Sequence, residues 1–255
     1  MIAADTWAYA NRLRDVDPAQ KLGCAAALLV ACLALNTVST GLVVLAFVTA
    51  VLLGWARVPS RVFARVLLAE GAFVVVAIAG VALTVGGMQP FGAHGIWIGA
   101  LFVGVTPEGL ALAALLASRT LGAMSCLTFV AFTTPLPDTV VVLQRLRVPP
   151  PLIELVTLIY RFVFVLLETV AQLRLAQEAR LGSATLRRRV VAAGQLVVGM
   201  WLDAYRRAQA GQRALESRGY DGVLRILPGV YRHEPRLVGA TGGVVLLLIV
   251  LRFGG

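Results

Sequence analysis

The feature that most constrains the fold is a series of long apolar segments, the first of which carries no charged side chain from residue 22 to residue 55. As one helix this stretch would be about 50 Å long, which exceeds a bilayer, so we divide it at Asn36–Gly41. Further spans are expected at about 66–85, 108–132 and 237–251. With 59% hydrophobic residues, 14% charged residues and a mean hydropathy of +0.85, the sequence predicts an all-α polytopic membrane protein with about five transmembrane helices.

The charge pattern predicts the topology of these spans. Arg57, Arg61 and Arg65 mark one loop as cytoplasmic, whereas residues 36–41 and 86–107 contain no Lys or Arg. The N-terminus is then cytoplasmic, and its charged residues lack the pattern of a cleaved signal peptide. We expect four transmembrane helices in residues 1–132, a cytoplasmic region at 133–236 and a last transmembrane helix at 237–255. The net charge of +10 therefore reflects topology and a partner surface, not nucleic acid.

Three polar or aromatic features interrupt the apolar pattern. His94 and Met88 in the second outer loop are too few for a convincing metal site. Trp97 and Phe102 in the same loop suit interfacial anchors or a short re-entrant segment. Arg119 lies within the fourth span, where a structural contact is the favoured interpretation.

The cytoplasmic region predicts one short helix and two long ones that cross each other. Prolines bound a short amphipathic segment at 138–147, and residues 152–180 and about 184–218 follow as helices. In the third helix, small and apolar residues recur at helical spacing. We expect this stripe to pack on the second helix and on a partner, with Gly194 permitting close backbone approach; its central members are Gly194, Val198, Trp201 and Tyr205.

Each long helix closes on an arginine. The first ends in Glu178-Ala179-Arg180-Leu181-Gly182 and the second in Glu216-Ser217-Arg218-Gly219-Tyr220. Arg followed by Gly places a guanidinium, with five fixed donors, at the C-terminal tip of a helix. Two such tips predict docking at two partner sites.

Groups that would carry catalysis are scarce in this sequence. Lys21 is the only lysine and is followed by Leu22, which excludes a GxxxxGK[ST] phosphate loop. Asp17-Pro18 fits a helix cap better than a magnesium site shared with Asp15. The three cysteines lie in apolar segments without metal-ligand spacing: Cys24, Cys32 and Cys126. The competing class is a small polytopic membrane enzyme, such as a prenyl or lipid transferase.

Four segments carry a resemblance to a known family, and together they extend over much of the chain. They are Asp17-Pro18-Ala19-Gln20-Lys21, Thr133-Thr134-Pro135, Leu143-Gln144-Arg145-Leu146-Arg147-Val148-Pro149 and Tyr160–Glu168. With the two arginine tips, they resemble the transmembrane T component (EcfT/CbiQ family) of energy-coupling factor transporters, most closely its cobalt branch. Leu181 and Ser217 depart from the family's Ala-Arg-Gly pattern, which commonly has Gly and Ala at these positions.

The resemblance implies a multi-pass, non-catalytic coupling subunit of an ATP-driven cobalt or nickel importer in the bacterial inner membrane. Its partners would be two ATPase subunits (CbiO-like), a substrate-capturing membrane subunit (CbiM-like), the lipid bilayer and, as a further candidate, a small accessory membrane subunit (CbiN-like). ATP and Mg would bind the ATPases and cobalt the capturing subunit, so this chain itself would hold no cofactor. The ATPase-docking residues would be Arg180 and Arg218 with Glu178, Ala179, Glu216, Ser217 and Gly219, and Tyr160 and Arg161 would join the coupling stripe.

Overall fold

The computed structural model describes residues 3–86, 94–98, 101–179, 185–220, 229 and 231–253. The chain divides into two compact units. The bundle unit comprises Ile2–Pro135 and Val230–Gly255, and the paired-helix unit comprises Leu136–Gly229.

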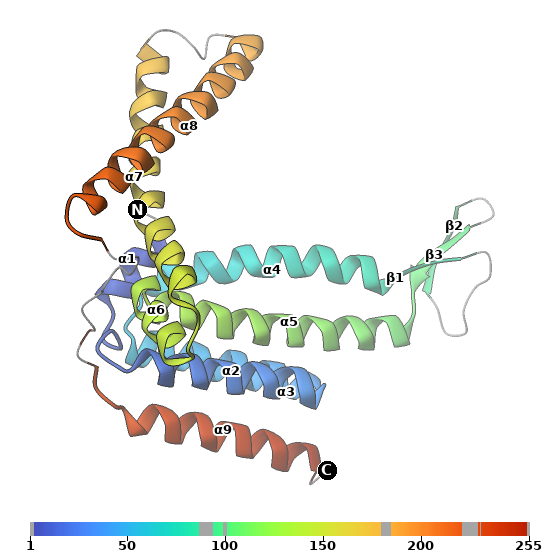
Figure 1. Cartoon of the computed structure of the whole chain (residues 1–255). Coiled ribbons are helices and arrows are strands. Elements are labelled where there is room, and N and C mark those ends of the chain that lie inside the picture. The colour runs from blue at the N-terminus through green and yellow to red at the C-terminus, as the bar shows by residue number, and fades with distance from the viewer. Residues whose placement is uncertain are drawn as a thin grey trace. The chain divides into compact units, whose positions relative to one another are not determined.

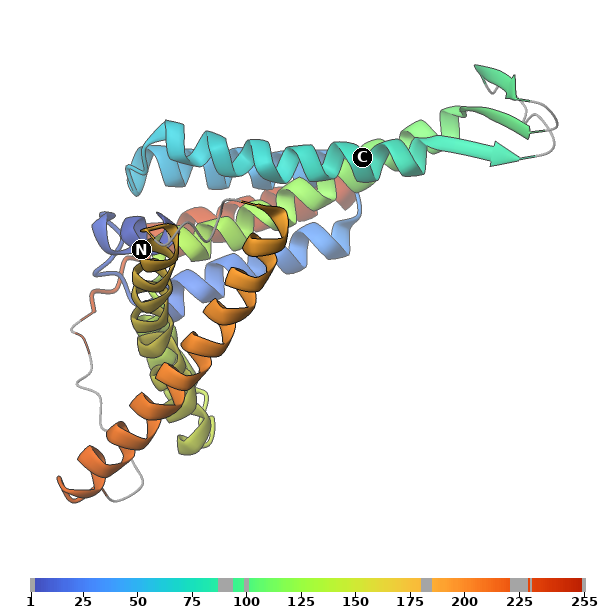
Figure 2. The same cartoon turned by 90° about the horizontal axis from the view of Figure 1, so that it is seen from above.

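The bundle unit is built from helices with a small sheet at one end (Figures 1 and 2). Its elements are α1 (Ala3–Ala10), α2 (Pro18–Leu35), α3 (Val38–Ala50), a π-helical segment (Val51–Trp55), α4 (Ser60–Ala82), β1 (Leu83–Gly86), β2 (His94–Ile98), β3 (Leu101–Val105), α5 (Pro107–Thr133) and α9 (Pro235–Phe253). We call the end at which α2, α4 and α9 begin and α5 finishes the base of the bundle.

Polar residues at the helix ends explain where the apolar stretches begin and stop. Asp17 caps α2 by accepting a hydrogen bond from the Ala19 N–H at 3.0 Å, which confirms its interpretation as a cap. Asn36 ends α2 in the left-handed region, with φ of 47°, and Thr37 caps α3. The predicted division of residues 22–55 is therefore confirmed. Thr106 caps α5 through the Gly109 N–H at 3.0 Å.

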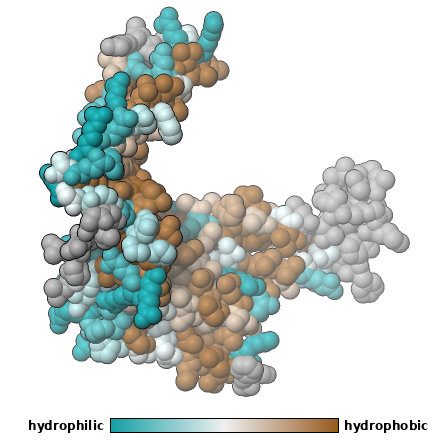
Figure 3. Space-filling model, viewed as in Figure 1, coloured by the Kyte–Doolittle hydropathy of each residue, from teal (hydrophilic) through white to brown (hydrophobic). Residues whose placement is uncertain are grey.

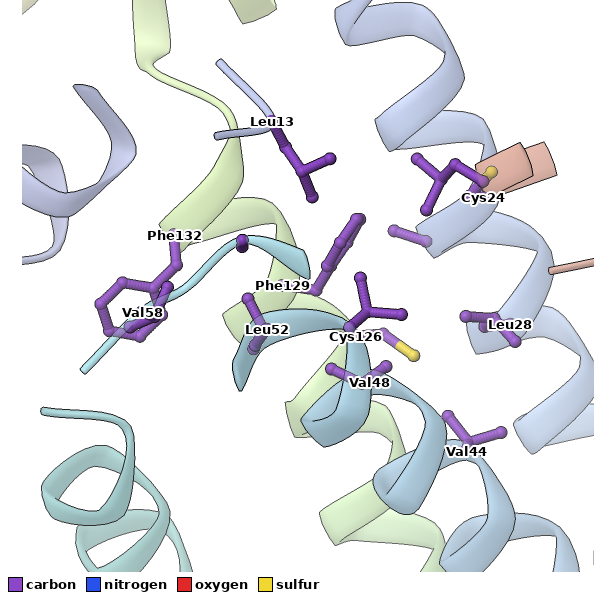
Figure 4. Packing of buried hydrophobic residues seen from close by; sticks show 14 of the residues in the cluster. Leu13, Cys24, Leu28, Val44, Val48, Leu52, Val58, Cys126, Phe129 and Phe132 are labelled. Atoms are coloured by element: carbon purple, nitrogen blue, oxygen red, sulfur yellow. The ribbon is translucent and has the colours of Figure 1, made fainter. Parts of the chain in front are cut away.

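The core of the bundle unit lies where α2, α3 and α5 meet (Figure 4). Its buried residues include Leu28, Val44, Val48, Cys126 and Phe129. Backbones approach closely beside this core, because a Cβ added at Gly41 would lie 2.1 Å from the Ser118 carbonyl oxygen. Glycine is required there, since no side chain fits in that space.

The outer faces of the bundle helices are apolar. Figure 3 shows hydrophobic side chains along α4, α5 and α9, and Leu68, Phe73 and Val76 on α4 are each more than 65% exposed. Six helices in the described part of the chain are long and apolar enough to cross a membrane, namely α2, α3 with the π-helical segment, α4, α5, α7 and α9. The prediction of an all-α polytopic membrane protein is confirmed. The count exceeds the expected five by α7, which we had placed in the cytoplasmic region.

The second outer loop contains a sheet that we did not predict. β3 pairs antiparallel with both β1 and β2, so that Leu83 lies opposite Val105 and Trp97 opposite Phe102. Trp97 and Phe102 thus belong to strands, not to a re-entrant segment. The β-branched and aromatic residues of this stretch favour extended backbone, which also explains why α4 ends at Ala82 and not at residue 85. Met88 lies outside the described residues.

Arg119 makes the structural contact that we favoured. Its Nη1 donates to the Asn36 Oδ1 at 3.2 Å, at the α2–α3 turn. α2 ends and α3 begins at this turn. Arg119 therefore lies level with the end of α2 and the start of α3, not with the middle of either helix. A charged group at that level can reach the membrane interface.

The base of the bundle is fastened by Lys21 and Asn11. The Lys21 side chain is fully buried, and its Nζ donates to the Leu13 carbonyl at 3.1 Å and the Thr133 carbonyl at 2.8 Å. Asn11 Nδ2 donates to the Phe132 carbonyl at 2.9 Å. The bonds to Phe132 and Thr133 satisfy carbonyls that the C-terminus of α5 leaves open, and the Lys21 cation suits the negative end of that helix.

The paired-helix unit contains α6 (Leu136–Arg145), α7 (Pro150–Ala179) and α8 (Leu186–Glu216), which matches the predicted short helix and two long ones. Pro149 and Pro150 separate α6 from α7. At the end of α6, Arg147 adopts a φ of 58°, and the Val148 N–H donates to the Leu143 carbonyl at 3.1 Å.

Candidate functional site

The two long helices of the paired-helix unit run antiparallel and cross. Gln177 Nε2 near the end of α7 donates to the Ala192 carbonyl near the start of α8 at 2.9 Å. Further along, Thr169 donates to Asp203 Oδ2 at 3.1 Å. The residue number of the contact rises along α8 as it falls along α7, so the two helices run in opposite directions (Figure 1). The predicted crossing is present.

The face of α8 that contacts α7 differs from the predicted one. Trp201, Val198 and Tyr205 are 71%, 59% and 58% exposed, so the predicted packing of this stripe on the second helix is wrong. Gly194 is also exposed, and a Cβ there would meet no atom within 4 Å. The contact instead uses Gly199, where a Cβ would lie 3.5 Å from Leu173 Cδ1. Because α7 is the one helix that packs on α8 in the described part of its unit, α8 buries only a narrow face. Its apolar stripe is left exposed.

A polar group ties the crossing together. Asp203 Oδ2 accepts hydrogen bonds from Thr169 and, at 2.7 Å, from Arg207 Nε on the next turn of α8. The Arg207 guanidinium, foremost, and the Thr169 hydroxyl hold the pKa of the Asp203 carboxyl below its usual range. Asp203 therefore stays ionised at neutral pH and keeps both bonds.

The Arg218 tip has the hydrogen bonds of a Schellman motif. The Tyr220 N–H donates to the Leu215 carbonyl at 3.1 Å and the Gly219 N–H to the Glu216 carbonyl at 3.1 Å. Gly219 has a φ of 73°, a conformation that costs a glycine little. The motif closes α8 after Glu216 and leaves the Arg218 side chain exposed.

A second bond fastens the same tip to α7. The Tyr220 hydroxyl donates to a Glu154 carboxylate oxygen in the first turn and a half of α7. Neither residue was among the predicted site residues, although Tyr220 closes the arginine motif. Glu216 accepts from Gln212 Nε2 at 2.8 Å and the Ser217 hydroxyl donates to the Ala214 carbonyl at 3.0 Å, so both are engaged within α8.

The other tip is described up to Ala179. Glu178 accepts a hydrogen bond from Arg174 Nε at 3.0 Å on the surface of α7, whereas Arg180 and Leu181 lie outside the described residues. Since α7 and α8 are antiparallel, their C-terminal ends lie at opposite ends of the pair. A helix of 30 residues is about 45 Å long, so Ala179 at the end of α7 is separated from the Arg218 tip by a distance of that order.

Tyr160 and Arg161 lie in the first half of α7. The Tyr160 ring meets the Phe164 ring edge to face, with centroids 4.9 Å apart, and Arg161 is exposed. Within the residues that the structure describes, no group of three or more His, Cys, Asp or Glu side chains is arranged to hold a metal ion.

Comparison with known proteins places this arrangement in a family. Residues 10–227 match the family model for CbiQ, the cobalt transport protein. The chain belongs to the CbiQ family of cobalt transport proteins. The resemblance seen in the sequence is thereby confirmed, and the chain is a multi-pass membrane component of a transport system.

Individual relatives extend the match. An uncharacterized protein of Methanocaldococcus jannaschii is 28% identical over 98% of this chain and 92% of its own length. The cobalt transport protein CbiQ of Rhodobacter capsulatus is 38% identical over 56% of this chain and 59% of its own length. A putative fused cobalt transport protein CbiMQ of Methanocorpusculum labreanum is 34% identical over 62% of this chain and 26% of its own length.

Proposed function

We propose that this chain is the coupling subunit of an ATP-driven energy-coupling factor importer for cobalt ions. It would transmit the motion of two ATPase subunits to a separate membrane subunit that captures the ion. The observation that carries the proposal is the antiparallel α7–α8 pair, which holds one arginine-ended tip in a Schellman motif and directs the other C-terminus to its opposite end.

Two widely separated tips suit two copies of one ATPase. The Arg218 guanidinium is exposed at its helix end, so a carboxylate or carbonyl groove on a partner can accept its hydrogen bonds. Arg180 would act in the same way at the other tip. If the antiparallel pair moves as one body, movement of one end displaces the other, and the two docking sites would be coupled mechanically.

The open stripe of α8 suits the substrate-capturing subunit. Val190, Val198 and Trp201 are between 59% and 71% exposed on a helix whose other face meets α7. Exposed apolar residues in such number typically mark an interaction surface. The fused CbiMQ relative supports a CbiM-like partner for this chain, which we place at the stripe, and cobalt would be bound by that partner as cargo. A CbiN-like subunit is a further candidate member of the complex.

The base of the bundle is proposed to face the cytoplasm. Exposed arginines gather at the base, where the positive-inside rule places them; they are Arg12, Arg14, Arg57, Arg61, Arg65, Arg232 and Arg236. The N-terminus would then be cytoplasmic. In a bacterial host, the protein would lie in the inner membrane.

Co-purification tests the assignment. The tagged full chain is expressed with its genomic neighbours, and ATPase subunits are expected in the purified complex, which hydrolyses ATP while the chain alone does not. Arg218→Ala should reduce ATPase retention, whereas Arg213→Ala, at an exposed arginine five residues earlier in α8, should not. Purification without any ATPase, together with prenyl or lipid transfer by the chain alone, would instead support the membrane-enzyme alternative.

A further inference from the structure

A groove runs between two parallel helices of the bundle unit. α2 and α9 both begin at the base, where the Asp17 N–H donates to the Arg232 carbonyl at 3.0 Å and the Glu234 N–H donates to Gln20 Oε1 at 3.0 Å. Beyond these bonds the helices leave a groove of about 470 Å³. This volume lies within the range of small-molecule sites, about 300–1,000 Å³.

The polar lining of the groove gathers toward the base. Gln20 lies at the base, Val238 and Thr241 line the first two turns of α9, and Ala27, Val245 and Ile249 line the remainder. From Thr241 to Ile249 the apolar part extends for about 12 Å along α9. Gly23 and Gly242 form part of the lining, and a Cβ added at either would meet no atom within 4 Å. The groove thus changes from partly polar near the base to apolar further along, and its two glycines leave space beside the backbone.

Thr241 points to a ligand because its hydroxyl is unsatisfied. The residue is 4% exposed, and its Oγ1 has no hydrogen-bond partner in the described part of the chain. Thr49 and Thr120, by contrast, donate to the carbonyls four residues earlier at 2.7 Å, as helical threonines commonly do. A buried unpaired hydroxyl is unfavourable, so its retention in this groove fits an occupant that supplies a partner.

We propose that the α2–α9 groove binds a glycerophospholipid of the leaflet at the base of the bundle. One acyl chain lies along Ala27, Val245 and Ile249. The carbonyl oxygen of a glycerol ester accepts a hydrogen bond from the Thr241 hydroxyl. Gln20, whose Oε1 is occupied by the Glu234 N–H, offers its amide N–H₂ to the head group. A phospholipid fits because its polar groups lie at one end and hydrocarbon fills the rest, matching the order of the lining residues. The site is separate from the α7–α8 pair and its proposed docking role.

Photolabelling in the intact complex tests the site. The full chain, with the partners that co-purify, is placed in nanodiscs containing a phosphatidylethanolamine with a diazirine in the distal half of one acyl chain. Cross-links mapped by peptide mass spectrometry are expected at Ala27, Val245 and Ile249 in excess of those on the outward side of α9, at Leu247. Equal labelling of groove and outward side would show bulk lipid contact and overturn the proposal.

Matched variants separate a site from a fold defect. Gly242→Leu fills the groove and should reduce groove labelling to the level of Leu247, whereas Gly243→Leu, on the same helix and also free of neighbours within 4 Å, should leave it unchanged. Thr241→Val should weaken lipid retention about fivefold, the effect of one net hydrogen bond. Unchanged labelling in Gly242→Leu would overturn the proposal. So would labelling that occurs in the isolated chain and vanishes in the complex, because a partner's transmembrane helix would then occupy the groove.

Discussion

The phenol hydroxyl of Tyr220 donates a hydrogen bond to the carboxylate of Glu154, 66 residues earlier in the chain. This bond fastens the end of α8 to the beginning of α7, two residues beyond the exposed Arg218. In the proposed docking model, Tyr220 is therefore a positioning residue for the guanidinium.

Removing the Tyr220 hydroxyl should loosen the Arg218 tip without unfolding α8. Tyr220→Phe removes one net hydrogen bond, about 1 kcal/mol, and we expect faster amide exchange at 215–220 and weaker ATPase retention. Glu154→Gln keeps a carbonyl acceptor and should retain more ATPase than Glu154→Ala. Equal losses in the two Glu154 variants would show that the hydrogen bond does not position the tip.

The two arginines should contribute to assembly separately. Arg180→Ala and Arg218→Ala are each expected to weaken ATPase binding by about 2 to 5 kcal/mol, the usual cost of removing one partner of a buried charged contact. The double variant should fail to assemble, and Arg→Lys should rescue poorly because an ammonium lacks the planar fork of donors. Pull-down of the ATPases by the double variant at wild-type yield would contradict the docking model.

Gly211 within α8 and Gly219 just beyond it should respond in opposite ways to substitution by alanine. Neither position has a neighbour within 4 Å of an added Cβ, but Gly219 has a φ of 73° and Gly211 lies within the helix. Gly219→Ala should destabilise the tip by about 1 kcal/mol, whereas Gly211→Ala should stabilise the helix by about 0.5–1 kcal/mol. Hydrogen exchange across 205–220 measures both effects, and protection that rises in both variants would count against the Schellman motif.

The parts of the fold that the sequence predicted correctly depend on local chemistry. Asn36 and Thr37 end one helix and cap the next within two residues, and prolines separate α6 from α7, so the helix order followed from short-range rules. The strands β1 to β3 were missed because they are short and lie in a glycine-rich stretch, where a run of apolar residues is also compatible with a membrane segment.

The candidate site was less predictable because its bonds join distant residues. The partner of Tyr220 lies in another helix, and nothing near Tyr220 in the sequence identifies Glu154. The stripe through Trp201 predicted a packed face, yet apolar periodicity does not distinguish a face covered by the chain itself from one left for a partner. Lys21 served to exclude a phosphate loop and as part of the Asp17–Lys21 segment, and neither use predicts that its side chain is buried against the Leu13 and Thr133 carbonyls.

Lys21 should be essential for the stability of the bundle base. Lys21→Met removes the donor to both carbonyls. The Leu13 carbonyl keeps its bond from the Val16 N–H at 3.2 Å, whereas the Thr133 carbonyl loses its Lys21 donor, and an unsatisfied buried group costs about 1–3 kcal/mol. We expect a clear fall in the midpoint of thermal unfolding in detergent, followed by tryptophan fluorescence. Arg12→Met, which removes an exposed cation nearby, is the control and should leave the midpoint unchanged. A wild-type midpoint for Lys21→Met would show that this clamp does not hold the base together.

Gly194 and Gly199 distinguish the open face of α8 from its contact face. A leucine at Gly199 must enter the space beside Leu173, where a Cβ already lies 3.5 Å from Cδ1, so Gly199→Leu should overpack the α7–α8 crossing by about 1–3 kcal/mol. Gly194→Leu meets nothing within the chain and should leave its stability unchanged. If the open stripe contacts the substrate-capturing subunit, Gly194→Leu should nevertheless lower cobalt uptake per ATP hydrolysed in the reconstituted complex. Thermal unfolding of the isolated chain and radiolabelled cobalt uptake separate these effects. Unchanged uptake per ATP in an intact Gly194→Leu complex would exclude this part of the stripe from coupling and direct attention to the 133–149 segment.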